Sequence, residues 1–271
     1  MFECVVNISE GWRLDVLDEL SRAAGTSLRD RHADPTHARS VFTLINRRDE
    51  LRDDVHGLIE AALTRIDLRG QWGVHPRLGV VDVVPYVALD DWRANEALGL
   101  RNETAAWMGQ ELGIPVFLYG ALRNGSIRTL PEVRKYAFKE LAPDFGPPTA
   151  SAELGASAVG ARGVLVAWNI WVRGISLEEG KRVAKAVRSR DVRALAFPIK
   201  EFVQISCNLI EPYNLGPAQL YDQVKGLLTG GEIERCELVG LAPEAVVSQT
   251  DPARWAQLGL SLDSTIETRL A

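Results

Sequence analysis

The chain has 271 residues, of which 46% are hydrophobic and 25% charged, and its formal net charge is -5. This length and composition allow one large hydrophobic core or two smaller ones. The mild acidity argues against the concentrated basic surface that nucleic acid or an anionic membrane requires. We therefore expect small-molecule ligands, with neither nucleic acid nor a membrane as partner.

The cysteine pattern and the length of the apolar runs indicate in which cellular compartment the protein works. Cys4, Cys207 and Cys236 are scattered and odd in number, which fits neither a disulfide framework nor a zinc site. No apolar run approaches the roughly 20 residues that span a bilayer. The N-terminus lacks a basic segment followed by an apolar one. We therefore expect a cytoplasmic protein.

The first half alternates strand-like and helix-like patterns. An apolar stripe from Leu51 to Ile66 at helical spacing is the strongest helix signal, and Pro131 is suited to the first turn of a short helix. In chain order, we predict strands at 2–6, 27–31, 40–46, 80–89 and 115–120, and helices at 12–24, 51–66, 93–113 and near 131.

The second half has a clearer order. Ser176 and Glu179 open a helix in the manner of a capping box. We predict strands at 163–172, 194–199, 202–210 and 233–242, and helices at 176–189 and 217–228. This order is βαββαβ, the ferredoxin-like arrangement, and the first half can be interpreted in the same way. The predicted fold class is α+β, with two ferredoxin-like α/β sandwich subdomains, 1–161 and 162–271, and a groove between them.

Residues 143–163 join the halves and are rich in Pro, Gly, Ala and Ser. Small residues and turn formers dominate, so we predict a linker or an extended active-site loop. Glycines here allow a ligand to approach the backbone closely, and Arg162 can hold an anion. The alternative is an ordinary connector.

The stretch WGVHPRLGVVDVVPYV, residues 72–87, is the most informative. His75 and Arg77 stand in a Gly- and Pro-bounded loop directly before a predicted strand, a favourable place for chemistry. An imidazole can transfer protons near neutral pH, and a guanidinium can bind a carboxylate through two hydrogen bonds. The alternative is a surface turn in which His75 only contacts backbone.

Two polar stretches in the first half have weaker signals. In NISEG, residues 7–11, an anion site at a helix N-terminus is possible, but an N-cap at Ser9 is favoured on this stretch alone. In RDRHADPTHARS, residues 29–40, His32, Asp34 and His37 could join His75 in a metal site. A polar loop with a turn at Asp34-Pro35 is favoured over metal.

Taken together, these segments resemble the formiminotransferase domain family. The matching segments are ordered along the chain and cover nearly all of it: ECVVNISEG, ADPTHARSVFTL, IDLRGQWGVHPRLGVVDVVPYV, IPVFLYG, RTLPEVR, APDFGPPTASAELGASAVGAR, LVAWNI, VQISCNL and ELVGLAP. Of these, VHPRLGVVDVVPYV and APDFGP are the most specific. The chain also lacks the Walker, GxGxxG, GxSxG and HExxH motifs of other large enzyme classes.

The resemblance implies an activity in one-carbon metabolism and histidine catabolism: a glutamate formimidoyltransferase that passes a formimino group from N-formimino-L-glutamate to tetrahydrofolate, its co-substrate, without a metal. His75 matches the family's catalytic histidine and would act as base and then acid. The resemblance also implies a homodimer. The residues implied to bind glutamate or folate are Asn7, Ser9, Gly11, Arg39, Arg77, Gly160, Arg162 and Asn169.

The chain departs from the family pattern at three positions. Val74 and His32 stand where acidic residues are usual, and Ala38 stands where an Asn is common. Losing carboxylates near His75 would lower its pKa and remove an orienting partner. The alternatives are therefore a non-catalytic folate- or anion-binding homologue and a transferase with another donor. A third alternative, which rests on His32, Asp34, His37 and His75, is a metal-dependent hydrolase.

Overall fold

The computed structural model describes residues 1–70, 73 and 76–271. The chain divides into two compact units, Met1–Gly163 and Val164–Ala271. Each unit packs helices on a sheet, which confirms the predicted α+β class. Within the described residues, no helix is long and apolar enough to cross a membrane.

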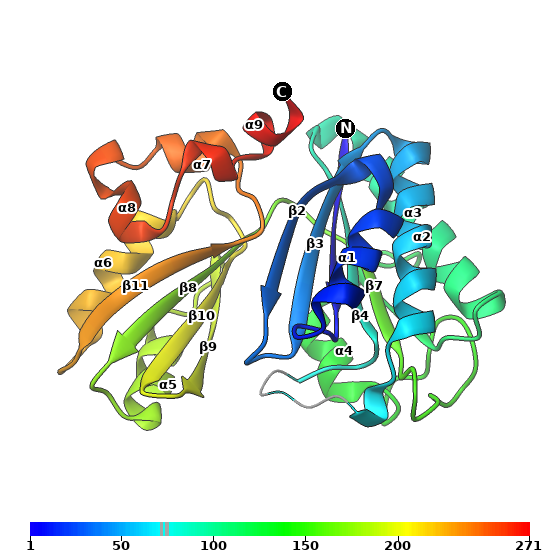
Figure 1. The fold of residues 1–271 in the computed structure, drawn as a ribbon, viewed down its shortest axis with the longest axis horizontal. Helices are drawn as coiled ribbons and strands as arrows, with labels where there is room; N and C mark the ends of the chain where they lie inside the picture. The colour runs from blue at the N-terminus through cyan, green and yellow to red at the C-terminus, as the bar shows by residue number, and fades with distance from the viewer. Residues whose placement is uncertain (71–72, 74–75) are drawn as a thin grey trace. The chain divides into compact units, whose positions relative to one another are not determined.

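The first unit contains β1 (Phe2–Ile8), α1 (Leu14–Ala23), β2 (Leu28–Asp34), β3 (Arg39–Asn46), α2 (Arg48–Arg65), β4 (Val81–Ala88), α3 (Ala94–Gln110), β5 (Val116–Ala121), β6 (Ile127–Arg128), α4 (Leu130–Tyr136) and β7 (Ser157–Ala161). In the described part of the chain its strands form one sheet in the order β2-β3-β1-β4-β7-β5-β6; β2, β3, β4 and β7 are labelled in Figure 1. β1 pairs antiparallel with β3 and β4, whereas β7 runs parallel to β4 and β5. From β1 to β4 the element order is βαββαβ.

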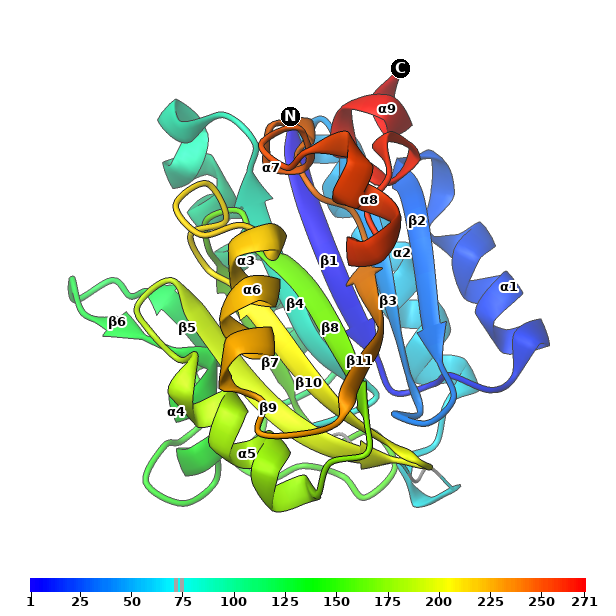
Figure 2. The same ribbon diagram turned by 90° about the vertical axis from the view of Figure 1, so that its left-hand side faces the viewer.

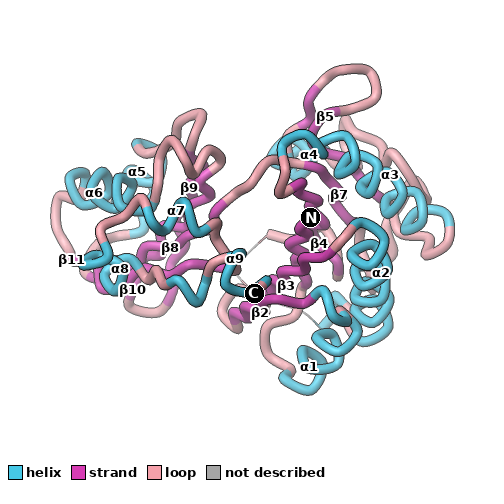
Figure 3. The backbone as a smooth tube through the Cα atoms, turned by 90° about the horizontal axis from the view of Figure 1, so that it is seen from above, coloured by secondary structure: helices cyan, strands magenta, loops and turns pink. Residues whose placement is uncertain are grey.

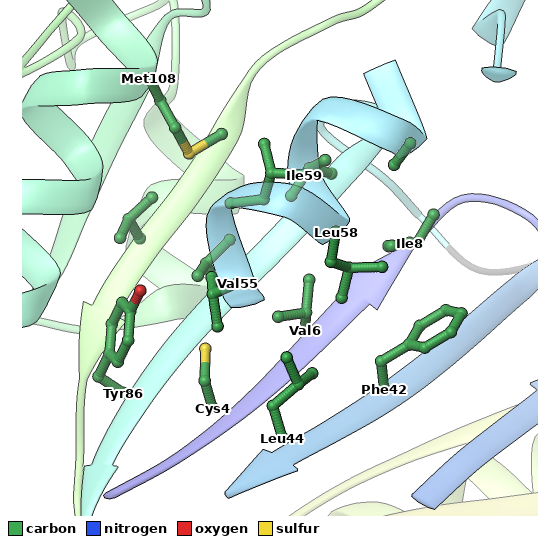
Figure 4. Close-up of a cluster of buried hydrophobic side chains, with 14 of the residues drawn as sticks. Cys4, Val6, Ile8, Phe42, Leu44, Val55, Leu58, Ile59, Tyr86 and Met108 are labelled. Atoms are coloured by element: carbon green, nitrogen blue, oxygen red, sulfur yellow. The ribbon is translucent and has the colours of Figure 1, made fainter. Parts of the chain in front are cut away.

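Helices α1, α2 and α3 cover one face of this sheet, as the view from above shows (Figure 3). Alternate residues of a strand point to opposite faces, so Cys4, Val6 and Ile8 of β1 point towards the helices (Figure 4). The predicted stripe of α2 supplies the opposing surface, with Val55 and Leu58 fully buried. The helical period read from the sequence therefore positions the largest core.

A second, smaller core lies on the other face. Val133 of α4 packs with Val83 of β4 and with Phe117 and Tyr119 of β5. Thr129 caps α4, since its hydroxyl accepts from the Glu132 N–H and the Glu132 carboxylate accepts from the Thr129 N–H. The helix predicted near Pro131 is confirmed, and α4 covers only the β4-β7-β5 side of this face.

The prediction of a linker or loop across residues 143–163 is wrong for its second part. Ser157–Ala161 form β7, a fully buried strand between β4 and β5. At Gly160 the ring of Tyr119 lies against the strand, and a Cβ there would be 2.2 Å from that ring. Composition alone suggested a connector, whereas a close approach explains the glycine.

The second unit contains β8 (Val166–Arg173), α5 (Leu177–Ala186), β9 (Val192–Ile199), β10 (Phe202–Leu209), α6 (Pro217–Leu227), β11 (Glu232–Val239), α7 (Glu244–Ser248), α8 (Trp255–Leu258) and α9 (Ile266–Leu270). Its antiparallel sheet has the order β11-β8-β10-β9. Helices α5 and α6 pack on one face (Figure 2). Ser176 caps α5 by accepting from the Glu179 N–H, as predicted.

Candidate functional site

Ser9 joins the end of β1 to the segment before β4. Its hydroxyl donates to the Gly79 carbonyl at 2.8 Å, and its N–H donates to the Val80 carbonyl at 2.8 Å. The predicted N-cap is therefore wrong, because α1 begins only at Leu14 and Ser9 gives it no hydrogen bond. The Ser9 N–H is occupied as well, so it does not offer the anion-binding donor considered for this stretch.

Gly11 lies against the turn between β2 and β3. A Cβ at this position would be 2.4 Å from the Asp34 carbonyl oxygen and 2.8 Å from the Arg39 nitrogen. Only a residue without a side chain permits that approach. Beside it, Asn7 is buried on β1 and donates its side-chain N–H to the Val5 carbonyl at 2.8 Å. Asn7, Ser9, Gly11 and Arg39 thus lie at one end of the sheet.

The turn at residues 35–38 is organised by Asp34. Its Oδ1 accepts from the N–H groups of Thr36 and His37 at 2.8 and 3.1 Å, and its Oδ2 lies 3.7 Å from His37 Nε2. The predicted turn at Asp34-Pro35 is confirmed, but the predicted loop is shorter than expected since residues 28–34 form β2. Ala38 has φ +46°, a left-handed conformation in which Asn is several-fold enriched.

Arg39, the first residue of β3, lies among several charged groups. Burial lowers its pKa to about 10, so the guanidinium keeps its charge at neutral pH; Asp82 and Asp34 act to raise this pKa, and Arg134 and Arg77 to lower it. These five groups comprise three guanidinium groups and two carboxylates. The cluster therefore carries an excess of positive charge.

Asp82 is the most buried charge of this cluster, at 2% exposure. Its Oδ2 accepts from Arg134 Nη2 at 2.6 Å, and its Oδ1 accepts from the Leu78 N–H at 2.8 Å. Arg134 Nη1 reaches Asp82 Oδ1 and the Pro76 carbonyl, both at 3.2 Å. An ion pair therefore fastens the segment before β4 to α4.

Arg77 lies within this fastened segment. Its Nη2 donates to the His37 carbonyl at 3.3 Å. Its Nη1 is buried and has no hydrogen-bond partner among the described residues. Burial lowers the Arg77 pKa, and the nearby Asp82 carboxylate opposes that change. A buried guanidinium nitrogen without a partner is costly, and an anion would satisfy it.

His75, the predicted catalytic residue, lies outside the described residues, and so does Val74. The described residues on either side contact the cluster. A Cβ on Gly73 would be 2.6 Å from the His37 carbonyl oxygen and 2.8 Å from Arg77 Nη2. Pro76 accepts the hydrogen bond from Arg134.

Gly160 and Arg162 lie at a different end of the sheet from Ser9 and Gly11. The Arg162 N–H donates to the Tyr86 carbonyl at 3.0 Å, and Phe2 and Cys4 pair with this end of β4. The six positions from Glu3 to Ser9 span about 20 Å at roughly 3.3 Å per residue. The structure therefore separates the predicted residues of the first unit into two groups.

Arg162 affects two buried acidic groups. Burial raises the pKa of Glu3 to about 7, and the Arg162 guanidinium acts in the opposite direction. Burial also raises the pKa of Tyr119 to about 12, again opposed by Arg162. A positive charge is thus held beside a carboxyl group that titrates near neutrality, at 3% exposure.

Asn169 belongs to the second unit, on β8. Its side-chain N–H donates to Glu237 Oε2 at 3.5 Å, and Trp171 Nε1 donates to the same oxygen at 3.2 Å. Arg235 lies 4.0 Å from the Trp171 ring centroid. Aromatic, amide and charged groups therefore meet on one face of this sheet.

The described residues contain no group of three or more His, Cys, Asp or Glu side chains able to hold a metal ion. Of the residues considered for metal binding, His32 lies on β2, Asp34 and His37 interact at the turn, and His75 is not described.

Two members of the cluster, Asp82 and Arg134, were not predicted from the sequence. Asp82 stands in the otherwise apolar stretch VVDVVPYV, where a lone carboxylate is itself a signal because buried charges need partners. Arg134, its partner, lies 52 positions away in RTLPEVR, so no local pattern connects the two.

Comparisons with known proteins identify the family of the chain. Residues 1–162 match the family model of the formiminotransferase domain, N-terminal subdomain. The chain is 34% identical to a glutamate formimidoyltransferase of Thermoplasma acidophilum, covering 90% of this chain and 88% of that protein. It is 29% identical to a glutamate formimidoyltransferase of Streptococcus pyogenes serotype M1, covering 89% and 88%. A formimidoyltransferase-cyclodeaminase of Sus scrofa is 33% identical over 78% of this chain and 44% of its own length.

Proposed function

The chain belongs to the formiminotransferase domain family, and from that premise we propose that it is a glutamate formimidoyltransferase. It transfers a formimino group from N-formimino-L-glutamate to tetrahydrofolate. The relatives named for this activity align with about nine-tenths of the chain, which supports the proposal.

The observation that carries the proposal is the unpartnered guanidinium nitrogen of Arg77 within an arginine-rich cluster. Arg77 Nη1 is buried without a hydrogen-bond partner in the described part of the chain, and the surrounding groups carry excess positive charge. The donor has two carboxylates, and a guanidinium binds a carboxylate through parallel hydrogen bonds. We assign one donor carboxylate to Arg77, with Arg39 as the neighbouring positive charge.

In this proposal His75 moves the protons. N5 of tetrahydrofolate forms a bond to the formimino carbon and gives its proton to the imidazole. The imidazole then returns a proton to the glutamate nitrogen as the bond between that nitrogen and the carbon breaks. One group of intermediate pKa can serve as base and then acid. The covalent chain joins His75 through Pro76 to Arg77, the residue assigned to the donor.

Arg162 is assigned to the folate. Arg162 is a positive charge beside Glu3, which lies about 20 Å along β1 from Ser9, a separation that suits an extended ligand with an anionic tail. The folate role implied for Asn169, which lies beside Trp171 and Glu237, rests on the family resemblance alone. We further propose that the enzyme works as a cytoplasmic homodimer, as the family resemblance implies.

The test is a direct assay of the purified chain with N-formimino-L-glutamate and tetrahydrofolate. We expect 5-formimino-tetrahydrofolate and free glutamate to form in equal amounts. A His75→Ala variant should lose at least about 100-fold in kcat, the usual scale of one general acid-base group. Normal turnover by that variant would exclude the mechanism. Folate binding without transfer would favour the non-catalytic homologue, and turnover only with another donor would correct the substrate.

A further inference from the structure

We infer that Asp82 and Arg134 are positioning residues for Arg77. The inference rests on the proposed function, because that function assigns a donor carboxylate to Arg77. Neither residue needs to touch the substrate. Their effect is to fix the backbone on both sides of the arginine that does.

The hydrogen bonds of the pair bracket Arg77. On one side, the Pro76 carbonyl accepts from Arg134 Nη1 at 3.2 Å. On the other, the Leu78 N–H donates to Asp82 Oδ1 at 2.8 Å. The two side chains are joined at 2.6 Å, between Arg134 Nη2 and Asp82 Oδ2. The pair therefore fastens a three-residue segment with Arg77 at its centre.

The Arg77 side chain itself is held weakly. Its hydrogen bond from Nη2 to the His37 carbonyl is 3.3 Å long, beyond the usual range for N–H···O contacts. Its Nη1 points to no protein acceptor among the described residues. The direction of the guanidinium therefore depends strongly on where the backbone is held, and binding depends on that direction because the arginine fork is rigid.

Asp82 has an electrostatic role in addition. Arg77 and Arg134 both lower the pKa of Arg39, and Asp82 raises it, so the carboxylate offsets repulsion among three guanidinium groups. A nearly buried ion pair adds little to stability compared with apolar residues of the same size. Its position beside the cluster is therefore better explained by placing Arg77 than by stabilising the fold.

The same unit contains a matched control. Asp144 Oδ2 accepts from the Leu118 N–H at 2.7 Å and from Arg128 Nη1 at 2.5 Å, while Arg128 Nη1 also donates to the Leu118 carbonyl at 3.1 Å. This pair fastens backbone in the same manner, and its arginine is about as exposed as Arg134, at 19% against 21%. It holds β5 rather than the segment around Arg77.

The experiment compares Arg134→Met with Arg128→Met in the full-length chain by steady-state kinetics. We expect Arg134→Met to raise the KM for N-formimino-L-glutamate about tenfold, with the KM for tetrahydrofolate and kcat within about threefold of the original values. Arg128→Met should also lower Tm, by a smaller amount because Asp144 is more exposed than Asp82, at 24% against 2%, and should leave all three constants unchanged. In an Arg77→Met background, Arg134→Met should raise the donor KM no further.

Three outcomes would overturn the inference: an unchanged donor KM in Arg134→Met, the same KM change in both single variants, or additive effects of Arg134→Met and Arg77→Met. If Arg134→Met fails to fold because Asp82 is left unpaired, the Asp82→Asn/Arg134→Met variant replaces it with the same expectations. If the unmodified chain does not turn over the donor, the proposed function fails by itself. In that case Tm is measured for Arg77→Met, for Arg134→Met and for the double variant. The inference requires the double variant to lose less Tm than the sum of the two single losses.

Discussion

Gly11 and Asp34 approach so closely that a Cβ on Gly11 would lie 2.4 Å from the Asp34 carbonyl oxygen. This contact places the backbone after β1 directly against the β2–β3 turn, which continues into Arg39. The position of Arg39 in the cluster therefore depends on the close approach of Gly11, a residue that has no side chain.

We expect Gly11→Ala to disturb both stability and binding. The methyl group must displace backbone rather than a flexible side chain, and overpacking of this kind costs about 1–3 kcal/mol. The same shift should raise the KM for the anionic donor. Calorimetry and steady-state kinetics measure the two effects.

Gly226→Ala is the control for that substitution. Gly226 lies in α6, and a Cβ there meets nothing within 4 Å. Alanine is the better helix former by about 1 kcal/mol, so this variant should be slightly more stable with unchanged kinetics. A neutral Gly11→Ala would show that the turn can move freely.

Ala38 provides a prediction of the opposite sign. It has φ +46°, and a left-handed conformation costs an L-residue about 1–2 kcal/mol. Replacing it by Gly should therefore raise the free energy of unfolding by about 1 kcal/mol, and Asn should give a smaller gain. Urea titration measures the difference.

Gly113→Ala tests the free-energy cost of a left-handed backbone by placing alanine where the chain has glycine. Gly113 has φ +65° and open space around its Cβ position, so backbone strain is the main expected effect. We expect a loss of about 1 kcal/mol. Equal stabilities of Ala38→Gly and the unmodified chain would show that the turn already tolerates alanine.

Much of the fold follows from local patterns, and the exceptions have physical causes. The stripe of α2 and the starts of α4 and α5 were predicted because helical spacing and capping are local properties. Strand β7 was missed because its composition resembles a connector, and its glycine, Gly160, is explained only by the ring of Tyr119, 41 positions earlier in the chain. Distant contacts of this kind leave no periodic signal.

In the candidate site, too, some residues were predicted from the sequence and others depend on contacts between distant parts of the chain. Arg39 and Arg77 were predicted through family resemblance, and the structure brings both to one cluster. The N-cap prediction for Ser9 was wrong because its hydroxyl bonds to Gly79 instead of capping a helix, and its predicted binding role stays a prediction. Arg134 was missed because only the folded chain brings it to Asp82.

His56 should make the protein sensitive to acid. Its ring stacks on Trp107 at 3.7 Å, and its Nε2 is 3.1 Å from Thr104 Oγ1. Burial, assisted by Arg52, lowers its pKa from 6.5 to about 4. The folded state therefore binds this proton less readily than the unfolded state, and stability is lost as the pH falls from about 6.5 to 4.

A His56→Gln variant tests this assignment. The amide can keep a hydrogen bond to Thr104 but does not titrate, so the variant should lose about 1–3 kcal/mol less than the unmodified chain between pH 7 and pH 4. Calorimetric Tm values across that range measure the difference. Parallel pH curves for the two proteins would contradict the role given to His56.

Glu3 should act in the opposite direction. Burial raises its pKa from 4.5 to about 7, with Arg162 only partly offsetting this effect. The folded state therefore holds the proton more tightly than the unfolded state. The contribution of Glu3 to stability is fully present below about pH 4.5 and is lost as the pH rises to about 7.

Glu3→Gln should remove this dependence and keep the shape of the protonated side chain. Between pH 4.5 and pH 8 the unmodified chain should lose about 1–3 kcal/mol that the variant retains. The control is Glu234→Gln, because Glu234 is exposed and pairs with Arg173 on the surface of the second unit, where an ion pair contributes little. If both variants changed the pH dependence of stability equally, the burial of Glu3 beside Arg162 would not be the cause of that dependence.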